Sequence, residues 1–593
     1  MMPTVSLGTP SDQKTAARSR SIVLVAGVLL CLAPVGLALW TTHTFGINVC
    51  SFDEFRVAFA VRDCDNGVLG LDNLYAQHDF HRHFFPLALM VLIATLTGFN
   101  SVAAMYASVL FYLGIAGILW LGFRRWAGEA RSNPLFYVAA MFILFSPAQF
   151  ENFTSGFQLT YSMPMFFALA GFYLLLRARE TRGRQSLWRF SLASLCAVIA
   201  SFSSSIGLLL WIPALWILWP RRNRGHGWGW LAAWVAAGSA VWYLYFHGFI
   251  FFAEVAPRVT TGDIPPLLHF GVTLIGNTIL YGERAAFWAG LTIITMLLLL
   301  VGWSRRRGLP GRHDFWIALA IYGLINAGSI AFARMAGGQE QAFISKYTLI
   351  GAPVVIGLLA MALDLSLGSS RPVSKAIIAA LLFLMGAGVA VSAVNGFRDA
   401  RSQARYNCMR AFILTTFDTQ PDRVLEQVMR FQPRFLRPVA EYMREKRYNV
   451  FAEQVIPECP EPCRIAPAPT FAGVLAVNGG PVDPDSRSAS IPLGSEFALL
   501  EGWALDPGRL TPASGVIIEI DGRRLPVFYG SRSPESVRSL KSPGLEYCGF
   551  ERAIDLAGLG PGRHDVGVRV ISGDGTHCEE IPVVVQLDIQ SGP

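Results

Sequence analysis

The stretch SVAAMYASVLFYLGIAGILWLGF, residues 101–123, decides the fold class of this chain. It holds 23 consecutive residues without a charged side chain, and Arg124 and Arg125 follow it directly. A helix needs about 20 apolar residues to cross the hydrocarbon core of a bilayer. The stretch therefore predicts a transmembrane helix that ends at a basic loop.

Other apolar runs repeat this pattern along the first two thirds of the chain. Runs of sufficient length lie at 22–40, 159–176, 228–250, 285–303, 315–333, 347–367 and 376–395, and shorter runs flanked by charge lie at 134–148, 190–203 and 206–219. Short runs can cross where the bilayer thins. We therefore predict a polytopic α-helical membrane protein with about eleven transmembrane helices.

The composition agrees with a membrane protein and excludes an ordinary cytosolic enzyme. Of the 593 residues, 53% are hydrophobic and 15% are charged, whereas soluble domains contain about 25% charged residues. The net charge of +8 comes from short basic clusters between apolar runs. This distribution predicts membrane topology and no nucleic-acid partner. Arginine far outnumbers lysine, which is typical of G+C-rich bacterial genomes.

The basic clusters also predict the orientation, because loops rich in Lys and Arg stay cytoplasmic. The N-terminal tail 1–20 is basic, and further clusters lie at 124–131, 177–189, 221–224, 305–312 and 371–375. All are cytoplasmic only if the apolar segment 84–98 lies on the outer membrane face without crossing. We therefore predict a bacterial inner-membrane protein with a cytoplasmic N-terminus and a periplasmic or extracellular C-terminal part. A cleaved signal peptide is the alternative for 22–40.

This topology places most polar residues suited to chemistry on the external side. The predicted external loop 41–100 contains the acidic pair Asp53 and Glu54, followed by His78, His81 and Arg82. A carboxylate can accept a proton, and cationic groups can hold a phosphate. The loop therefore offers the groups needed to displace a phosphate leaving group, although interfacial loops are also polar simply because they meet water.

Three stretches carry a resemblance to a known family. They are DNLYAQHDFHRHFFPLALM (72–90), SPAQFENFTSGFQ (146–158) and ISKYTL (344–349). They are similar to a His-Arg-x-x-Phe-Pro pattern, a Ser-Pro-x-Gln-x-Glu-Asn motif followed by Gly-Phe-Gln, and a Ser-Arg-Tyr motif. Across residues 21–395 the chain resembles the GT-C superfamily of polytopic glycosyltransferases, in particular a bacterial group within it.

The resemblance implies an external active site that uses a sugar donor linked to a lipid phosphate. It implies a general base in the first loop, at Asp53 or Glu54. Transfer from a polyprenyl-phosphate-linked sugar to an envelope glycan or lipid is the function we expect, with membrane lipids as further partners. The residues expected to bind substrate are His78, His81, Arg82, Glu151, Asn152, Gln158, Arg334, Lys346 and Tyr347.

Some of these assignments have alternatives. Arg82, Arg334 and Lys346 are expected to hold the phosphate, whereas the polar residues of 151–158 either bind sugar hydroxyls or cap short helices. We expect no cofactor, and the alternative is a divalent metal held by His78 and His81, which share a face if the segment is helical.

Two other functions compete with glycosyl transfer. One is a transporter or flippase of a lipid-linked glycan, which should carry charge within its spans. Asp364 is almost the only acid in a predicted span, which favours chemistry at the surface. The other is a scaffold that binds glycan.

The sequence predicts that the C-terminal third is a soluble part on the external side of the membrane. Residues 396–469 predict amphipathic helices followed by a proline-rich linker. Residues 470–593 predict an all-β sandwich, because short strand-like runs such as FALLEGWALD (497–506) and IPVVVQLDI (581–589) alternate with turns. Proximity along the chain suggests disulfides in an oxidising compartment, pairing Cys50 with Cys64, Cys459 with Cys463 and Cys548 with Cys578.

Overall fold

The computed structural model describes residues 10–126, 134–220, 228–250, 260–306, 311–367, 372–453, 455–466, 471–483, 485–492, 494–509, 511–534 and 544–590. The chain forms two compact units. Unit 1 comprises Met1–Gly46, Asp63–Thr95 and Ser101–Ser402, and unit 2 comprises Ile47–Arg62, Leu96–Asn100 and Gln403–Pro593.

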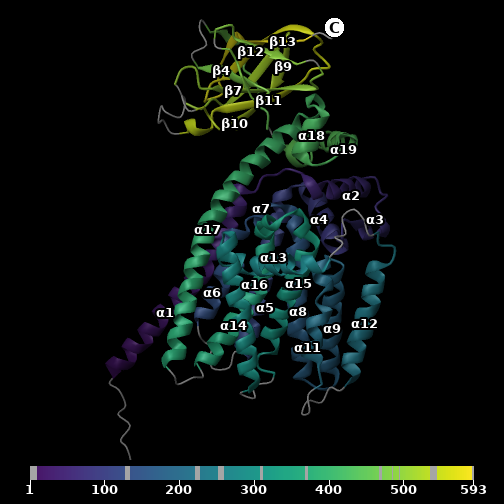
Figure 1. Ribbon diagram of the computed structural model, residues 1–593, viewed down its shortest axis with the longest axis vertical. Helices are drawn as coiled ribbons and strands as arrows, with labels where there is room; N and C mark the ends of the chain where they lie inside the picture. Colours follow the sequence, from purple (N-terminus) through teal and green to yellow (C-terminus); the bar gives the residue numbers. More distant parts are fainter. Residues whose placement is uncertain are drawn as a thin grey trace, which may run out of the picture. The chain divides into compact units, whose positions relative to one another are not determined.

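Unit 1 is a bundle of helices that run side by side (Figure 1). Its helices are α1 (Pro10–Phe45), α3 (Leu71–Tyr75), α4 (Phe84–Thr97), α5 (Ser101–Trp126), α6 (Pro134–Leu144), α7 (Glu151–Thr154), α8 (Leu159–Arg179), α9 (Gly183–Ser201), α10 (Ser205–Leu208), α11 (Trp211–Leu218), α12 (Trp228–Phe246), α13 (Ile264–Asn277), α14 (Glu283–Arg306), α15 (Asp314–Arg334), α16 (Thr348–Leu367) and the first part of α17 (Pro372–Thr415).

The bundle confirms a polytopic α-helical membrane protein. Among the described residues, six helices are long and apolar enough to cross a bilayer, and they are Ala26–Phe45, Ser101–Trp126, Gly156–Arg179, Glu283–Arg306, Asp314–Gly337 and Ser345–Leu365. The total of eleven spans stays a prediction. So does the orientation, because the basic clusters 124–131, 221–224, 305–312 and 371–375 lie partly or wholly outside the described residues.

Several predicted spans are shorter in the structure because local chemistry interrupts them. The run 134–148 ends its helix at Leu144, before a turn of 3-10 helix that begins at Pro147. The run 206–219 divides into α10 and α11, and the run 228–250 leaves its helix at Phe246, before Gly248 with a φ of 65°. Segment 84–98 is helical as predicted, as α4, and its placement on the membrane face stays a prediction.

The helices of unit 1 pack closely where small residues face one another, as membrane helices commonly do. A Cβ at Gly357 of α16 would lie 2.7 Å from the carbonyl oxygen of Trp316 on α15. The part of α16 that could span a membrane is buried along its whole length inside the bundle. The junction between α15 and α16 therefore adjoins a span that is buried inside the bundle.

Unit 2 contains a helical part and a β part. The helical part begins with a 3-10 turn η1 (Phe52–Glu54) and α2 (Phe55–Asp65), which belongs to unit 2 up to Arg62, and continues with the end of α17, the turn η9 (Phe417–Thr419), α18 (Asp422–Met429) and α19 (Pro433–Lys446). Both α18 and α19 are strongly amphipathic, as the sequence predicts for 396–455.

The β part is a sandwich of two sheets, as predicted. The strand orders are β10-β11-β7-β4-β5 and β3-β13-β12-β8-β9, and β6 also pairs with β13, further along that strand than β3 does. The strands are β3 (Arg464–Ile465), β4 (Ala472–Val477), β5 (Gly480–Pro481), β6 (Ser488–Ile491), β7 (Phe497–Ala504), β8 (Gly515–Ile520), β9 (Arg523–Pro526), β10 (Phe528–Ser531), β11 (Gly549–Asp555), β12 (Gly562–Ile571) and β13 (Cys578–Ile589). Alternate residues of β7, among them Leu500, pack against Phe550 and Val568 in the core. Trp503 is partly buried against this core.

The predicted cysteine pairs are wrong. The structure joins Cys463 to Cys578, whereas Cys50, Cys64, Cys459 and Cys548 are free cysteines. The reason is strand pairing, because β3 lies parallel to β13 with Arg464 opposite Glu579. That register brings Cys463 beside Cys578, a contact that spacing along the chain does not reveal.

Candidate functional site

The histidines of the predicted external loop lie in a small hairpin of unit 1. Strand β1 (Gln77–His78) pairs with β2 (His81–Arg82), and Asp79 makes the turn with a left-handed φ of 47°. The rings of His81 and His83 stack with their centres 5.1 Å apart, and Phe157 contacts both His78 and His83. The hairpin therefore gathers the three imidazoles against the turn that precedes α8.

Arg82 makes backbone contacts that hold this hairpin, and its role in phosphate binding stays a prediction. Its guanidinium donates to the carbonyl oxygens of Tyr245 at 2.7 Å, Tyr75 at 2.8 Å and His247 at 2.8 Å, and it lies over the ring of Tyr75. The side chain is buried. Its donors are directed at backbone carbonyls, so Arg82 fixes the hairpin to α3 and to the end of α12.

His81, Arg334 and Lys346 form what we call the cationic cluster of unit 1. Desolvation and, to a smaller extent, electrostatic interaction with Arg334, His78 and Lys346 together lower the pKa of His81 from 6.5 to about 3. The backbone N–H of Ser205 donates to His81 Nδ1 at 3.4 Å. The imidazole is therefore neutral at physiological pH, with its proton on Nε2, so it can donate a hydrogen bond without adding charge.

The cationic cluster lies at the ends of two successive spans. Arg334 is the last residue of α15, and Lys346 precedes α16 in the turn η8 (Ser345–Tyr347). Arg334 interacts electrostatically with Tyr347, Tyr161 and Asp79, and Lys346 Nζ lies 5.7 Å from the ring centre of Tyr347 and 5.9 Å from that of Tyr161. Arg334 and Lys346 thus share an aromatic wall at the ends of two helices that are long and apolar enough to cross a membrane.

Glu151 and Asn152 hold the backbone of this cluster in position. Glu151 Oε2 accepts from the Lys346 N–H at 3.0 Å, and Asn152 Nδ2 donates to the Lys346 carbonyl at 3.1 Å. The Glu151 N–H in turn donates to Ser345 Oγ at 3.2 Å. Residues separated by almost 200 positions therefore form one polar unit, in which Glu151 and Asn152 position Lys346.

Gln158 and Tyr347 complete the set predicted in unit 1. Both side chains are buried, and the amide oxygen of Gln158 has no hydrogen-bond partner among the described residues. Tyr347 packs against Tyr161, with ring centres 6.2 Å apart. The contacts place Tyr347 in the aromatic wall, and substrate binding by Gln158 stays a prediction.

The acidic pair of the first loop belongs to unit 2, and its two members differ in exposure. Asp53 is exposed, whereas Glu54 is only 6% exposed. Glu54 interacts electrostatically with Arg410 and Cys50. An exposed carboxylate can meet a substrate, whereas a buried one next to an arginine balances charge. Asp53 is therefore the accessible acid of the pair, and a catalytic role for either acid stays a prediction.

Residues far away in the sequence support this acidic turn. The guanidinium carbon of Arg410 lies 4.0 Å from the ring centre of Phe52, and that of Arg430 lies 5.2 Å from it. Asn449 Oδ1 accepts from the Cys50 N–H at 2.6 Å, and Asn449 Nδ2 donates to Asn48 Oδ1 at 3.0 Å. The start of the first loop is thus built on the helical part of unit 2.

The sequence reasoning did not identify Arg410, Arg430 or Asn449. The sequence predicts only amphipathic helices for the segment 396–455, whereas Arg410 is buried and packs on Tyr406 as well as on Phe52. Its position in a segment that the sequence predicts to be amphipathic was the only sign of burial. No short motif links it to the first loop, so only the fold reveals the contact.

A metal site at the histidines receives no support from the geometry. Within the described residues, the His, Cys, Asp and Glu side chains close enough to hold one ion are Cys459, Cys463 and Cys578. His81 Nδ1 is engaged by the Ser205 N–H, and His83 Nδ1 lies 2.8 Å from the Ser203 carbonyl. Metal dependence stays untested.

No protein-family model and no curated protein sequence matches this chain. Among solved structures, it is similar to ArnT from Cupriavidus metallidurans bound to undecaprenyl phosphate, with 15% identity, a TM-score of 0.38 and coverage of 73% of this chain and 76% of that chain. It is also similar to the arabinosyltransferase EmbB from Mycobacterium smegmatis, with 13% identity, a TM-score of 0.37 and coverage of 94% and 64%. Likenesses at this level carry no argument about the chemistry of this chain.

Proposed function

We propose that this chain is a membrane glycosyltransferase that moves a sugar from a polyprenyl-phosphate donor to an envelope glycan or lipid. The observation that carries the proposal is the cationic cluster, in which Arg334 and Lys346 share an aromatic wall at the ends of two spans. A lipid phosphate lies at that depth of a bilayer, and fixed cations stabilise the negative charge that develops on a leaving phosphate.

In this proposal each group has one role. Asp53 takes the proton of the acceptor hydroxyl as that oxygen attacks the anomeric carbon of the donor. Arg334 and Lys346 stabilise the departing lipid phosphate, and the neutral His81 donates a hydrogen bond from Nε2. Glu151 and Asn152 are positioning residues, because they bind the backbone of Lys346.

The transporter alternative is weakened by the environment of Asp364. A transporter is expected to keep ionisable groups near mid-membrane for its cargo. Asp364 lies close to the end of α16, where its carboxylate is paired with Arg312 and with His313 Nε2 at 2.8 Å. His313 is further held by Ser304 at 2.7 Å. The acid therefore stabilises the end of the helix.

The test compares envelope glycans and lipids by mass spectrometry in cells with the wild-type chain, a deletion, or a variant at matched protein levels. Asp53→Asn should remove the same sugar that the deletion removes, because the amide cannot accept the proton. Asp72→Asn is the matched control, since Asp72 is an exposed acid in the same region, and it should leave the product unchanged.

Glu54→Gln separates the two acids of the turn. We expect it to lower the amount of folded protein while the product per folded molecule stays within a few-fold of wild type. Loss of the product in Glu54→Gln with retention in Asp53→Asn would reverse the two assignments. Retention in both variants would favour a transporter or scaffold.

A further inference from the structure

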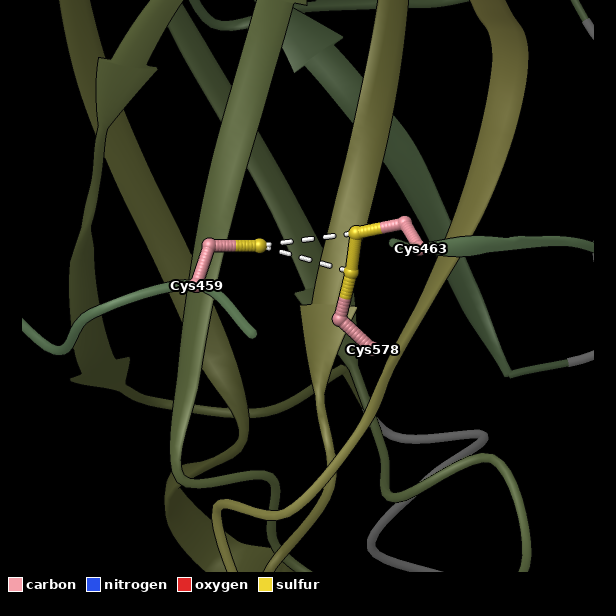
Figure 2. Close-up of side chains that lie close together, drawn as sticks. All are labelled: Cys459, Cys463 and Cys578. Atoms are coloured by element: carbon pink, nitrogen blue, oxygen red, sulfur yellow. Dashed lines mark hydrogen bonds between the residues drawn. A yellow bond between two sulfur atoms is a disulfide. The ribbon is translucent and has the colours of Figure 1, made fainter. Parts of the chain in front are cut away.

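Three sulfur atoms meet where the linker joins the β-sandwich of unit 2 (Figure 2). Cys463 and Cys578 form a disulfide, and the free Cys459 Sγ lies 3.5 Å from Cys463 Sγ and 3.3 Å from Cys578 Sγ. Cys459 and Cys463 precede β3, and Cys578 begins β13. A free thiol is thus in contact with both ends of a disulfide.

Thiol–disulfide exchange needs this arrangement, because a thiolate attacks one sulfur of a disulfide and the other sulfur leaves. Attack of Cys459 on Cys578 Sγ would form the Cys459–Cys578 bond, break the Cys463–Cys578 bond and leave the electron pair on Cys463, which takes up the proton lost by Cys459. Attack on Cys463 Sγ would form Cys459–Cys463 and release Cys578. Neither step needs an oxidant or a reductant.

The charged groups beside the sulfurs favour exchange over metal binding. Arg569 Nη1 lies 3.9 Å from Cys463 Sγ, where its charge stabilises a leaving thiolate and opposes a metal cation. Arg569 is also paired at 2.9 Å with each of three carboxylates, belonging to Glu461, Glu519 and Glu580. These acids, the nearby carboxylates that a metal site would use, therefore already neutralise this arginine.

We propose that Cys459, Cys463 and Cys578 are a thiol–disulfide exchange site in which one disulfide moves among three cysteines. The exchange has a structural consequence. The Cys463–Cys578 bond ties the linker to β13, where the Ala466 N–H also donates to the Glu580 carbonyl at 2.9 Å. A Cys459–Cys463 bond closes only a local ring and leaves Cys578 as a thiol, so the site decides how firmly the linker is held to the sheet.

The test uses the full-length protein in detergent and quantifies thiols by two-step alkylation. Free thiols are labelled with light iodoacetamide, the disulfide is reduced, and the released thiols are labelled with heavy reagent. Trypsin leaves Cys459 and Cys463 in one peptide, 448–464, so fragment ions between them locate each label. Burial raises the pKa of the Cys459 thiol, although Arg569 lowers it, so the labelling is repeated after incubation at pH 8.5.

Among Cys459, Cys463 and Cys578, the wild-type chain should carry one light label in total, shared between Cys459 and at least one of the other two cysteines; the free cysteines outside the cluster are counted separately. Two variants remove one partner each. Cys463→Ser should contain a Cys459–Cys578 disulfide, and Cys578→Ser should contain a Cys459–Cys463 disulfide. Cys64→Ser is the matched control, because Cys64 is an exposed free cysteine outside the cluster, and its labelling pattern at the three cysteines should equal that of wild type.

Three results would overturn the proposal. One is a light label at Cys459 alone in the wild-type chain, unchanged by incubation at pH 8.5. Another is a pair of free thiols in folded Cys463→Ser and Cys578→Ser proteins. The last is a purified wild-type chain with all three cysteines reduced and one zinc ion bound that Cys459→Ser loses, which would make the cluster a metal site. If a variant does not fold, the wild-type distribution alone decides.

Discussion

Arg410 and Phe52, 358 positions apart in the sequence, are in contact through the face of the phenylalanine ring, with the guanidinium carbon 4.0 Å from the ring centre. Phe52 has a left-handed φ of 51°, which a bulky residue adopts at a cost of about 1–3 kcal/mol. Contacts with Arg410 and Arg430 offset this cost. Asp53 follows directly, so the two arginines hold the turn that presents the proposed base.

Phe52→Ala should therefore weaken both the turn and the proposed reaction. The variant keeps the left-handed strain but loses both cation–π contacts, each of which contributes about 0.5–2 kcal/mol. We expect a lower melting temperature and roughly a tenfold loss of product per folded molecule, measured by mass spectrometry. Phe59→Ala is the control, since Phe59 also stacks near an arginine, Arg62, but lies away from Asp53. Equal activity in the two variants would refute this positioning role.

His81 should make stability depend on pH. Its pKa is about 3 in the folded chain against an ordinary value of 6.5, so below pH 6.5 the unfolded chain binds a proton that the folded chain does not. The free energy of unfolding should thus fall as the pH decreases from 6.5 toward 3. Above pH 6.5 the His81 side chain is neutral in both the folded and the unfolded chain, so it causes no loss of stability there. His81→Gln should flatten the dependence of the melting temperature on pH, whereas a substitution of the exposed His43 should not.

Glu151 offers a test of how Lys346 is positioned. Glu151→Ala removes the acceptor of the Lys346 N–H, whereas Glu151→Gln retains an acceptor at the same place. A neutral hydrogen bond is weaker than one to a carboxylate, so we expect wild-type > Glu151→Gln > Glu151→Ala in product per folded molecule. An alanine variant as active as the glutamine variant would show that this bond does not position Lys346.

Arg552 should link the sandwich to the helical part of unit 2. Its guanidinium is buried and donates to the Thr419 carbonyl at 3.0 Å and to Thr419 Oγ1 at 2.8 Å, and burial lowers its pKa to about 10. Arg552→Met leaves these acceptors unsatisfied, at a cost of about 1–3 kcal/mol. Limited proteolysis should then cut the chain near Thr419 faster than in wild type. Arg563→Met, at an exposed arginine of β12, should be cut at the wild-type rate.

The sequence by itself determined the class of the fold. An uncharged run such as 101–123 can satisfy its backbone polar groups inside a bilayer only as a helix, so helices follow from composition and length. Short strand-like runs such as FALLEGWALD, separated by turn residues, predicted the β-sandwich. Helices and strands of this kind depend on residues close together in the chain, so the local sequence is enough to predict them.

The tertiary structure alone decided which of the polar loop groups are engaged by the fold and which stay exposed. Arg82, Asp53 and Glu54 look alike as loop charges, yet three backbone carbonyls engage Arg82, and only Asp53 of the acidic pair is exposed. The partner of Cys463 likewise depends on the register of β3 against β13. The physical reason is that the burial of a side chain and its bonding partners depend on segments far away in the sequence. The local sequence does not determine which distant segment packs against it.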